Sequence, residues 1–142
     1  MSNNRLNIVI DTNVLLVSIS EYSKYHWLFK AILEKRFDVY LTNEILSEYE
    51  EIIGKYFNGD VARSVIRTLV ELENVKATVV YFKFDVIKAD VDDNKFVDCA
   101  FASNAHFLVS NDKHFEILKQ TFFPKVNVLK LEEFKMILEE EN

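Results

Sequence analysis

The sequence contains little glycine, proline or cysteine. Its 142 residues include 2 glycines and 1 proline, which leaves no flexible linker or low-complexity segment. Cys99 is the single cysteine, so an intrachain disulfide is excluded. The longest apolar runs are too short to span a bilayer, and the first residues lack the basic and apolar segments of a signal peptide. We therefore expect a cytoplasmic protein in a reducing compartment, without a membrane partner.

Basic residues are outnumbered by acidic ones. There are 17 lysines and arginines against 23 aspartates and glutamates, for a net charge of −6. This balance argues against a protein that coats nucleic acid by neutralising phosphates, but it suits an enzyme whose acids gather in one pocket and bind cations. Apolar residues make up 49 % of the chain, which is ordinary for a globular domain. We expect residues 1–142 to form a single domain.

Short β-branched runs alternate with amphipathic segments along the chain. The runs predict strands, and an apolar spacing of three and four residues predicts helices. We expect strands at 6–10, 39–41, 75–82, 107–110 and 126–129, and helices at 25–37, 45–57, 60–72, 96–101, 114–120 and 132–140. Asn43 is the expected N-cap of the second helix. The alternation predicts an α/β fold, with a parallel sheet covered by helices on both faces.

Two aspartates directly follow predicted strands. Asp11 ends the run LNIVI and is followed by Thr12 and Asn13, and Asp112 ends the run FLVSN. Ligands of parallel sheets bind at the carboxyl ends of the strands, so both acids lie where a site would form. Asp11 could instead form an Asx turn or cap a helix. The pattern does not give the strand order, and so it does not show whether the two acids are neighbours.

Other acids are harder to interpret from spacing alone. Glu44, Glu48 and Glu51 follow one helix face, which is usually a solvated face. Asp90, Asp92 and Asp93 repel one another unless water or a cation separates them, and such hard oxygen ligands suit Mg²⁺, Mn²⁺ or Ca²⁺. The spacing does not fit an EF-hand. We expect Asp98 on the surface of its helix.

The remaining chemical groups give weaker indications. Lys113 and His114 follow Asp112 and could contact a phosphate, although His114 could equally be an ordinary surface residue. His26 and His106 have no partners at metal-ligand spacing and are interpreted as structural, and Cys99 as buried and inert. No glycine-rich phosphate loop, nucleophile elbow or Cys/His zinc array is present. Carboxylates at strand ends are what remains, and they suit divalent cations held against a phosphodiester.

The chain resembles the PIN domain family. The resemblance runs from Asn7 to about Leu138, and within the family it is to the small stand-alone bacterial and archaeal proteins classed as toxins of toxin–antitoxin systems. The residues that carry it are IVIDTNVLL at 8–16, LTNEILSEYEEII at 41–53, DVDDNKFVDCAFASNAHFLVSND at 90–112 and the following KHF.

The resemblance implies a catalytic and metal-binding set of four acids: Asp11, Glu48, Asp93 and Asp112. Asp92 or Asn94 takes the third position if the register shifts by one residue. Asn13 and Ser110 are expected to steady the site, and Lys95, Lys113 or His114 to contact substrate phosphate. The family fold is a three-layer α/β/α sandwich whose parallel sheet of four to five strands has the order 3-2-1-4-5. That order makes strands one and four neighbours and brings Asp11 and Asp112 together.

The implied function is a metal-dependent endoribonuclease with one or two Mg²⁺ or Mn²⁺ ions per site. The implied partners are RNA, an antitoxin protein and a second copy of the chain. The alternatives are a DNA or flap-type nuclease and a catalytically inactive interaction domain. Receiver domains and haloacid phosphatases fit poorly, because the former need an acid pair and the latter Asp-x-Asp after the first strand, where this chain has Asp11-Thr12-Asn13.

Overall fold

A five-stranded, all-parallel sheet forms the centre of the computed structural model, which describes residues 5–140. The strand order is β3-β2-β1-β4-β5, as the resemblance implies, so the fold class is confirmed. The prediction of a single domain covers residues 1–142. Residues 1–4 and 141–142 lie outside the described part of the chain. The strands are β1 (Asn7–Ile10), β2 (Asp38–Leu41), β3 (Val75–Ala77), β4 (Phe107–Val109) and β5 (Val128–Leu129).

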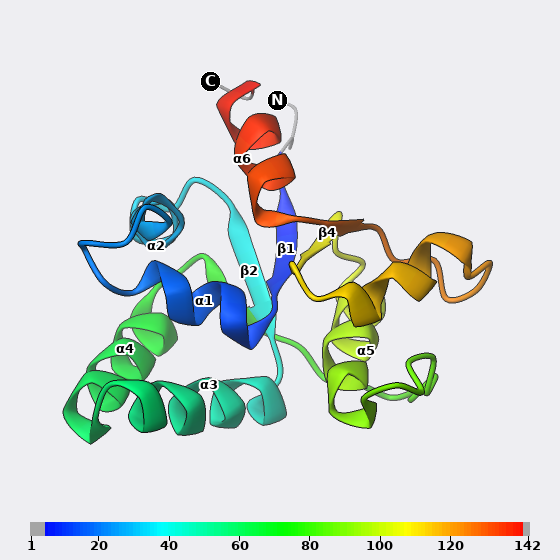
Figure 1. The fold of residues 1–142 in the computed structure, drawn as a ribbon, viewed down its shortest axis with the longest axis horizontal. Coiled ribbons are helices and arrows are strands. Elements are labelled where there is room, and N and C mark those ends of the chain that lie inside the picture. Colours follow the sequence, from blue (N-terminus) through cyan, green and yellow to red (C-terminus); the bar gives the residue numbers. More distant parts are fainter. Residues whose placement is uncertain (1–4, 141–142) are drawn as a thin grey trace.

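Helices connect and cover the strands (Figure 1). The α-helices are α1 (Thr12–Ser18), α2 (His26–Leu33), α3 (Asn43–Tyr56), α4 (Gly59–Glu71), α5 (Asn94–Ala102) and α6 (Leu131–Glu140), with short 3-10 helices η1 (Val91–Asp93) and η2 (Lys113–Gln120). α3 and α4 pack against each other. α6 is held by Phe134, whose ring meets that of Phe37 edge-on at 5.1 Å between centroids.

The core lies between the sheet and these helices. Ile8, Val9 and Ile10 of β1 are at most 1 % exposed, as are Leu108 and Val109 of β4. Continuous apolar strands of this kind are expected where both faces of a parallel sheet are covered. The residues that directly follow Ile10 and Val109 are therefore held in place by a close-packed core.

Three local predictions need correction. No helix was predicted at 12–18, but α1 forms there because Val14 and Leu15 are buried; seven residues are too few to show a clear periodicity. The third strand was predicted to reach residue 82 but ends at Ala77. Its partner β2 ends at Leu41, whose carbonyl accepts the last ladder bond from Thr78 N–H. Thr42, not Asn43, is the N-cap of α3, because its hydroxyl accepts from Ile45 N–H.

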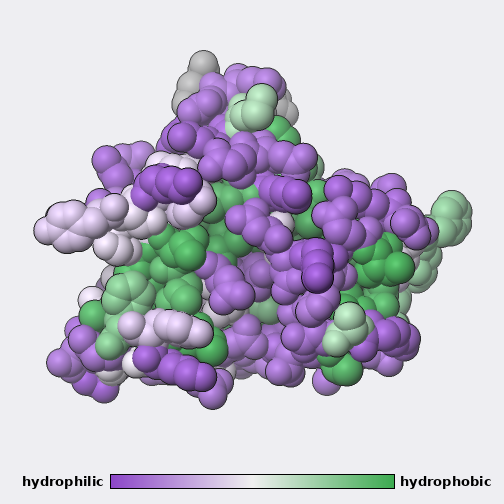
Figure 2. Space-filling view, in the orientation of Figure 1, coloured by the Kyte–Doolittle hydropathy of each residue, from purple (hydrophilic) through white to green (hydrophobic). Residues whose placement is uncertain are grey.

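The surface is mixed in character. Figure 2 shows hydrophilic side chains over the middle of one face and hydrophobic ones around α1, α3 and α4. Large exposed apolar side chains include Val17 on α1, and Tyr56 and Phe57 at the end of α3. Among the described residues, no helix is both long and apolar enough to cross a membrane.

Candidate active site

Asp11 and Asp112 meet at the carboxyl edge of the sheet because β1 and β4 are neighbours. Ile10 is paired with Val109, and Asp11 N–H donates to Val109 C=O at 3.1 Å. Ser110 joins the two acids: its hydroxyl donates to Asp11 Oδ2 at 2.7 Å and accepts from Asp112 N–H at 3.0 Å. Ser110 is 2 % exposed, so this arrangement is held inside the protein.

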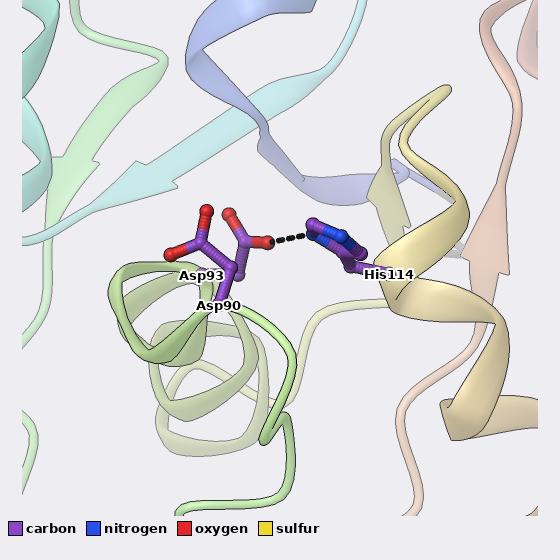
Figure 3. A group of neighbouring side chains, drawn as sticks. All are labelled: Asp90, Asp93 and His114. Carbon is purple, nitrogen blue, oxygen red and sulfur yellow. Dashed lines mark hydrogen bonds and ion pairs between the residues drawn. The ribbon is translucent and has the colours of Figure 1, made fainter.

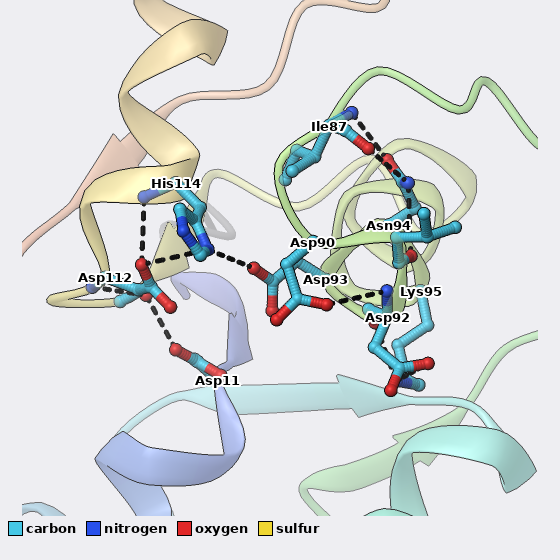
Figure 4. Close-up of polar contacts among 11 residues, drawn as sticks. Asp11, Ile87, Asp90, Asp92, Asp93, Asn94, Lys95, Asp112 and His114 are labelled. Carbon is cyan, nitrogen blue, oxygen red and sulfur yellow. Dashed lines mark hydrogen bonds and ion pairs between the residues drawn. The ribbon is translucent and has the colours of Figure 1, made fainter.

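Asp93 reaches the same place from the start of α5 (Figure 4). His114 lies between it and Asp112, with Nδ1 3.1 Å from Asp93 Oδ2 and 3.5 Å from Asp112 Oδ1. Because an ionised carboxylate only accepts hydrogen bonds, we assign the hydrogen to Nδ1. Asp112 Oδ1 also accepts from His114 N–H at 2.9 Å, which caps η2. His114 thus ties two of the acids together.

Glu48 is the fourth acid, and α3 carries it. Its Oε1 accepts from the Lys95 ammonium at 2.7 Å, and its Oε2 accepts from the Thr12 hydroxyl. The Lys95 side chain is 7 % exposed and that of Glu48 25 %. The contacts join α3 to the first turns of α5 and α1. Thr12 directly follows Asp11 in the chain, but its hydroxyl donates to Glu48.

Four like charges gather at this place, and the cluster of Asp11, Glu48, Asp93 and Asp112 is called the pocket below. Burial raises the pKa of Asp11 from 3.8 to about 6; the Ser110 hydrogen bond opposes this, and the charges of Asp93, Asp112 and Glu48 add to it. The pKa of Asp93 is also raised, first by burial, although its His114 contact acts in the other direction. Removing a carboxylate from water disfavours its charged form, and a bound cation reverses that effect.

The donor set fits a hard divalent cation. Within residues 5–140, hydrogen bonds engage one carboxylate oxygen each of Asp11, Asp93 and Asp112 and leave the second oxygen of each available. Mg²⁺ and Mn²⁺ prefer such oxygen ligands. In the described part of the chain, residues 5–140, the one group of three acids or histidines whose ligand atoms lie within 4.8 Å of one another is Asp90, Asp93 and His114 (Figure 3). Asp11 and Asp112 are linked to this group through Ser110 and His114. We favour the three aspartates, since Asp90 is exposed and caps η1, and His114 Nδ1 already donates to Asp93.

The register alternatives for the third acid lie elsewhere. The Asp92 side chain is 89 % exposed. Asn94 is buried, and its amide holds the preceding loop: it accepts from Ile87 N–H at 2.8 Å and donates to the carbonyls of Ile87 and Val91 at 2.9 and 3.1 Å. Only Asp93 of the three faces the other acids.

The other predicted site residues have different surroundings. Asn13 is exposed on the outer side of α1, and Lys113 is exposed beside the pocket. Lys95 was predicted to contact phosphate, but its ammonium is buried against Glu48. Asp98 was predicted on the surface but is 4 % exposed, and it accepts from Phe84 N–H of the loop before α5 at 3.1 Å. That prediction is wrong.

The histidines and the cysteine outside the pocket have structural surroundings. His26 Nδ1 lies 2.9 Å from Ser18 C=O, and His106 Nδ1 accepts from Asn7 N–H at 2.9 Å. Cys99 is fully buried, which raises the pKa of its thiol to about 12. A thiol that remains protonated at neutral pH is a poor nucleophile.

A family model of the PIN domain matches residues 7–114, a span that contains all four acids. The chain belongs to the PIN domain family. PIN domains are nucleases that hydrolyse phosphodiesters. Among curated proteins, none matches this PIN domain significantly by sequence.

Solved structures of other proteins share this fold. VapBC2 from Rickettsia felis, bound to a DNA fragment from its promoter, gives a TM-score of 0.60 at 15 % identity and covers 88 % of this chain and 98 % of its own. FitAcB from Neisseria gonorrhoeae gives a TM-score of 0.54 at 17 % identity, and the match covers 88 % of this chain and 98 % of the FitAcB chain. The PIN domain endonuclease Utp24 gives a TM-score of 0.52 at 16 % identity, and the match covers 87 % of this chain and 84 % of the Utp24 chain. At these identities the likeness concerns the fold alone.

Proposed function

We propose that this PIN domain is a Mg²⁺- or Mn²⁺-dependent endoribonuclease whose cation is held by Asp11, Asp93 and Asp112. Glu48 is the fourth carboxylate of the catalytic pocket. The observation that carries the proposal is the convergence of three aspartates that each keep one oxygen available, together with the raised pKa of Asp11. Carboxylates that are removed from water and repel one another destabilise the fold. Acids whose pKa values are perturbed in this way cluster at functional sites.

The chain's own groups prepare the pocket for this chemistry. Ser110 fixes the rotamer of Asp11, and His114 holds Asp93 and Asp112 in place. Lys113, exposed at the rim, is positioned to meet a substrate phosphate. When bound, the cation supplies charge to the phosphodiester oxygens and lowers the pKa of an attacking water. It also offsets the net charge of −6 at the place where RNA must approach.

We further propose that the protein is the toxin of a toxin–antitoxin system and forms a homodimer. Two similar structures, VapBC2 and FitAcB, are complexes of an antitoxin with a toxin. The exposed apolar side chains Val17, Tyr56 and Phe57 offer a surface for a protein partner. Light scattering of the purified chain, alone and after co-expression with the product of an adjacent small gene, measures both associations.

The replacement of Asp112 by asparagine tests the proposed nuclease. Asp112→Asn keeps the shape of the side chain and its bond to His114 N–H but removes the charge, so we expect Mn²⁺-dependent cleavage of an RNA oligonucleotide to fall by at least about 10²-fold. Asp60→Asn is the matched control, because the Asp60 side chain is 90 % exposed and pairs with Arg63. It should cleave at the wild-type rate.

Each alternative function corresponds to a distinct result. Wild-type activity in Asp112→Asn would contradict the site assignment. Faster cleavage of a DNA oligonucleotide of matched sequence would assign a DNA or flap-type nuclease. A wild-type chain that binds no Mg²⁺ or Mn²⁺ in a calorimetric titration would be an inactive PIN-like interaction domain.

A further inference from the structure

Glu48 differs from the three aspartates in how its oxygens are used. Lys95 Nζ donates to Oε1 and the Thr12 hydroxyl donates to Oε2, so both carboxylate oxygens have a protein partner. Asp11, Asp93 and Asp112 each have a hydrogen-bond partner on one oxygen only, among residues 5–140. The fourth acid of the pocket is therefore already neutralised by the chain itself.

Lys95 is built into this position. It lies in the first turn of α5, two residues after Asp93, and its ammonium also donates to Asp92 C=O at 2.6 Å. The Phe96 ring lies under the ammonium at 5.5 Å from the ring centroid. A side chain that is 7 % exposed, with these contacts made, does not reach a substrate phosphate from where it stands. Its charge acts on Glu48.

We propose that Lys95 is a positioning residue that replaces a second divalent ion. In sites with two metals, a second ion beside the first neutralises additional carboxylates. Here an ammonium 2.7 Å from Glu48 supplies that positive charge permanently. The pocket then takes one Mg²⁺ or Mn²⁺, at the three aspartates, and Glu48 is not a metal ligand. This inference rests on the proposed metal-dependent function and adds its metal stoichiometry.

Mn²⁺ titration of the purified chain tests the proposal. We expect wild type to bind one Mn²⁺ per chain, measured by calorimetry and by electron paramagnetic resonance of free Mn²⁺. Lys95→Met removes the charge but keeps the aliphatic stem, so it exposes Glu48 to the metal and should bind two. Lys119→Met is the matched control, since it breaks a Lys–Glu pair of similar length, 3.0 Å, whose side chains are about half exposed. It should still bind one ion.

Glu48→Gln provides a test that does not depend on the folding of Lys95→Met. The amide oxygen still accepts from Lys95, and if Glu48 is not a ligand, the Mn²⁺ dissociation constant should stay within about threefold of wild type. Two ions in wild type, one ion in a folded Lys95→Met, or a tenfold or greater loss of Mn²⁺ affinity in Glu48→Gln would each overturn the role of Lys95 alone. A wild-type chain that binds no ion would overturn the proposed function as well.

Discussion

Ser110 links two acids of the pocket through a single hydroxyl, so its removal should disturb both. Ser110→Ala loses the bond to Asp11 and leaves Asp112 N–H without its acceptor. Unsatisfied buried groups cost about 1–3 kcal/mol, and we expect that loss of stability with a roughly tenfold lower cleavage rate. Urea denaturation and initial rates measure the two effects.

Ser103→Ala is the control for that variant. The Ser103 hydroxyl binds only carbonyls of α5, at Cys99 and Ala100. We expect it to change stability by less than about 1 kcal/mol and the rate not at all. Equal rate losses in the two serine variants would contradict a specific role for Ser110.

Asp11 should make the metal-free protein less stable as pH rises. Its pKa is about 6 in the folded chain against an ordinary 3.8. Below pH 4, Asp11 is protonated in both the folded and the unfolded chain. Between pH 4 and 6 it ionises in the unfolded chain before it does so in the folded chain, so the free energy of unfolding falls. Above pH 6 the loss is complete, on the order of 3 kcal/mol.

Asp11→Asn isolates this effect from other titrating groups. In chelator, the variant should equal wild type near pH 4 and exceed it in unfolding free energy near pH 7. Mn²⁺ should then stabilise wild type more than the variant. Urea denaturation at several pH values measures the difference, and a difference that is independent of pH would contradict the assigned pKa.

At the scale of elements, the start of α5 depends on a loop that Asn94 holds. The Asn94 amide satisfies Ile87 N–H and C=O as well as Val91 C=O, and the next residue back along the chain is Asp93. Asn94→Ala should cost about 2–4 kcal/mol, speed amide exchange at Ile87 and weaken Mn²⁺ binding through Asp93. Asn127→Ala, at an exposed position, should do none of these. Unchanged exchange at Ile87 would contradict the role of Asn94.

The elements were predictable where one face is buried and less so elsewhere. The long helix α3 was predicted almost to its ends because its apolar residues recur at helical spacing over 14 residues. α1 was missed because β-branched residues in a seven-residue segment do not distinguish a helix from a strand. The length of β3 depends on where its neighbour β2 ends, which is information from the partner strand.

At the scale of the whole molecule, the negative charge sets how substrate binds. A protein that contacts 6–10 phosphates loses about 10³–10⁵ in affinity between 50 and 200 mM salt. This chain has a net charge of −6, so we expect kcat/KM on RNA to fall by less than about tenfold over that range at saturating Mn²⁺. A much steeper dependence would show that a basic surface or a partner supplies phosphate contacts.

The sequence by itself determined the fold class and the candidate acids. Alternating strand and helix patterns indicated a parallel sheet, and Asp11 and Asp112 directly after strands marked its carboxyl edge. The PIN resemblance added the strand order and selected Glu48 and Asp93 among their acidic neighbours.

Only the tertiary structure decided what each acid contacts. Asp92, Asp93 and Asn94 are adjacent in sequence, but their side chains point in different directions at the turn into α5. Asp93 faces the pocket, Asp92 faces solvent and Asn94 binds the preceding loop. Likewise, Lys95 meets Glu48 because α3 and α5 pack together, 47 residues apart in the chain. Hydrogen bonding and burial depend on distances between elements, and the spacing of residues along one element does not contain those distances.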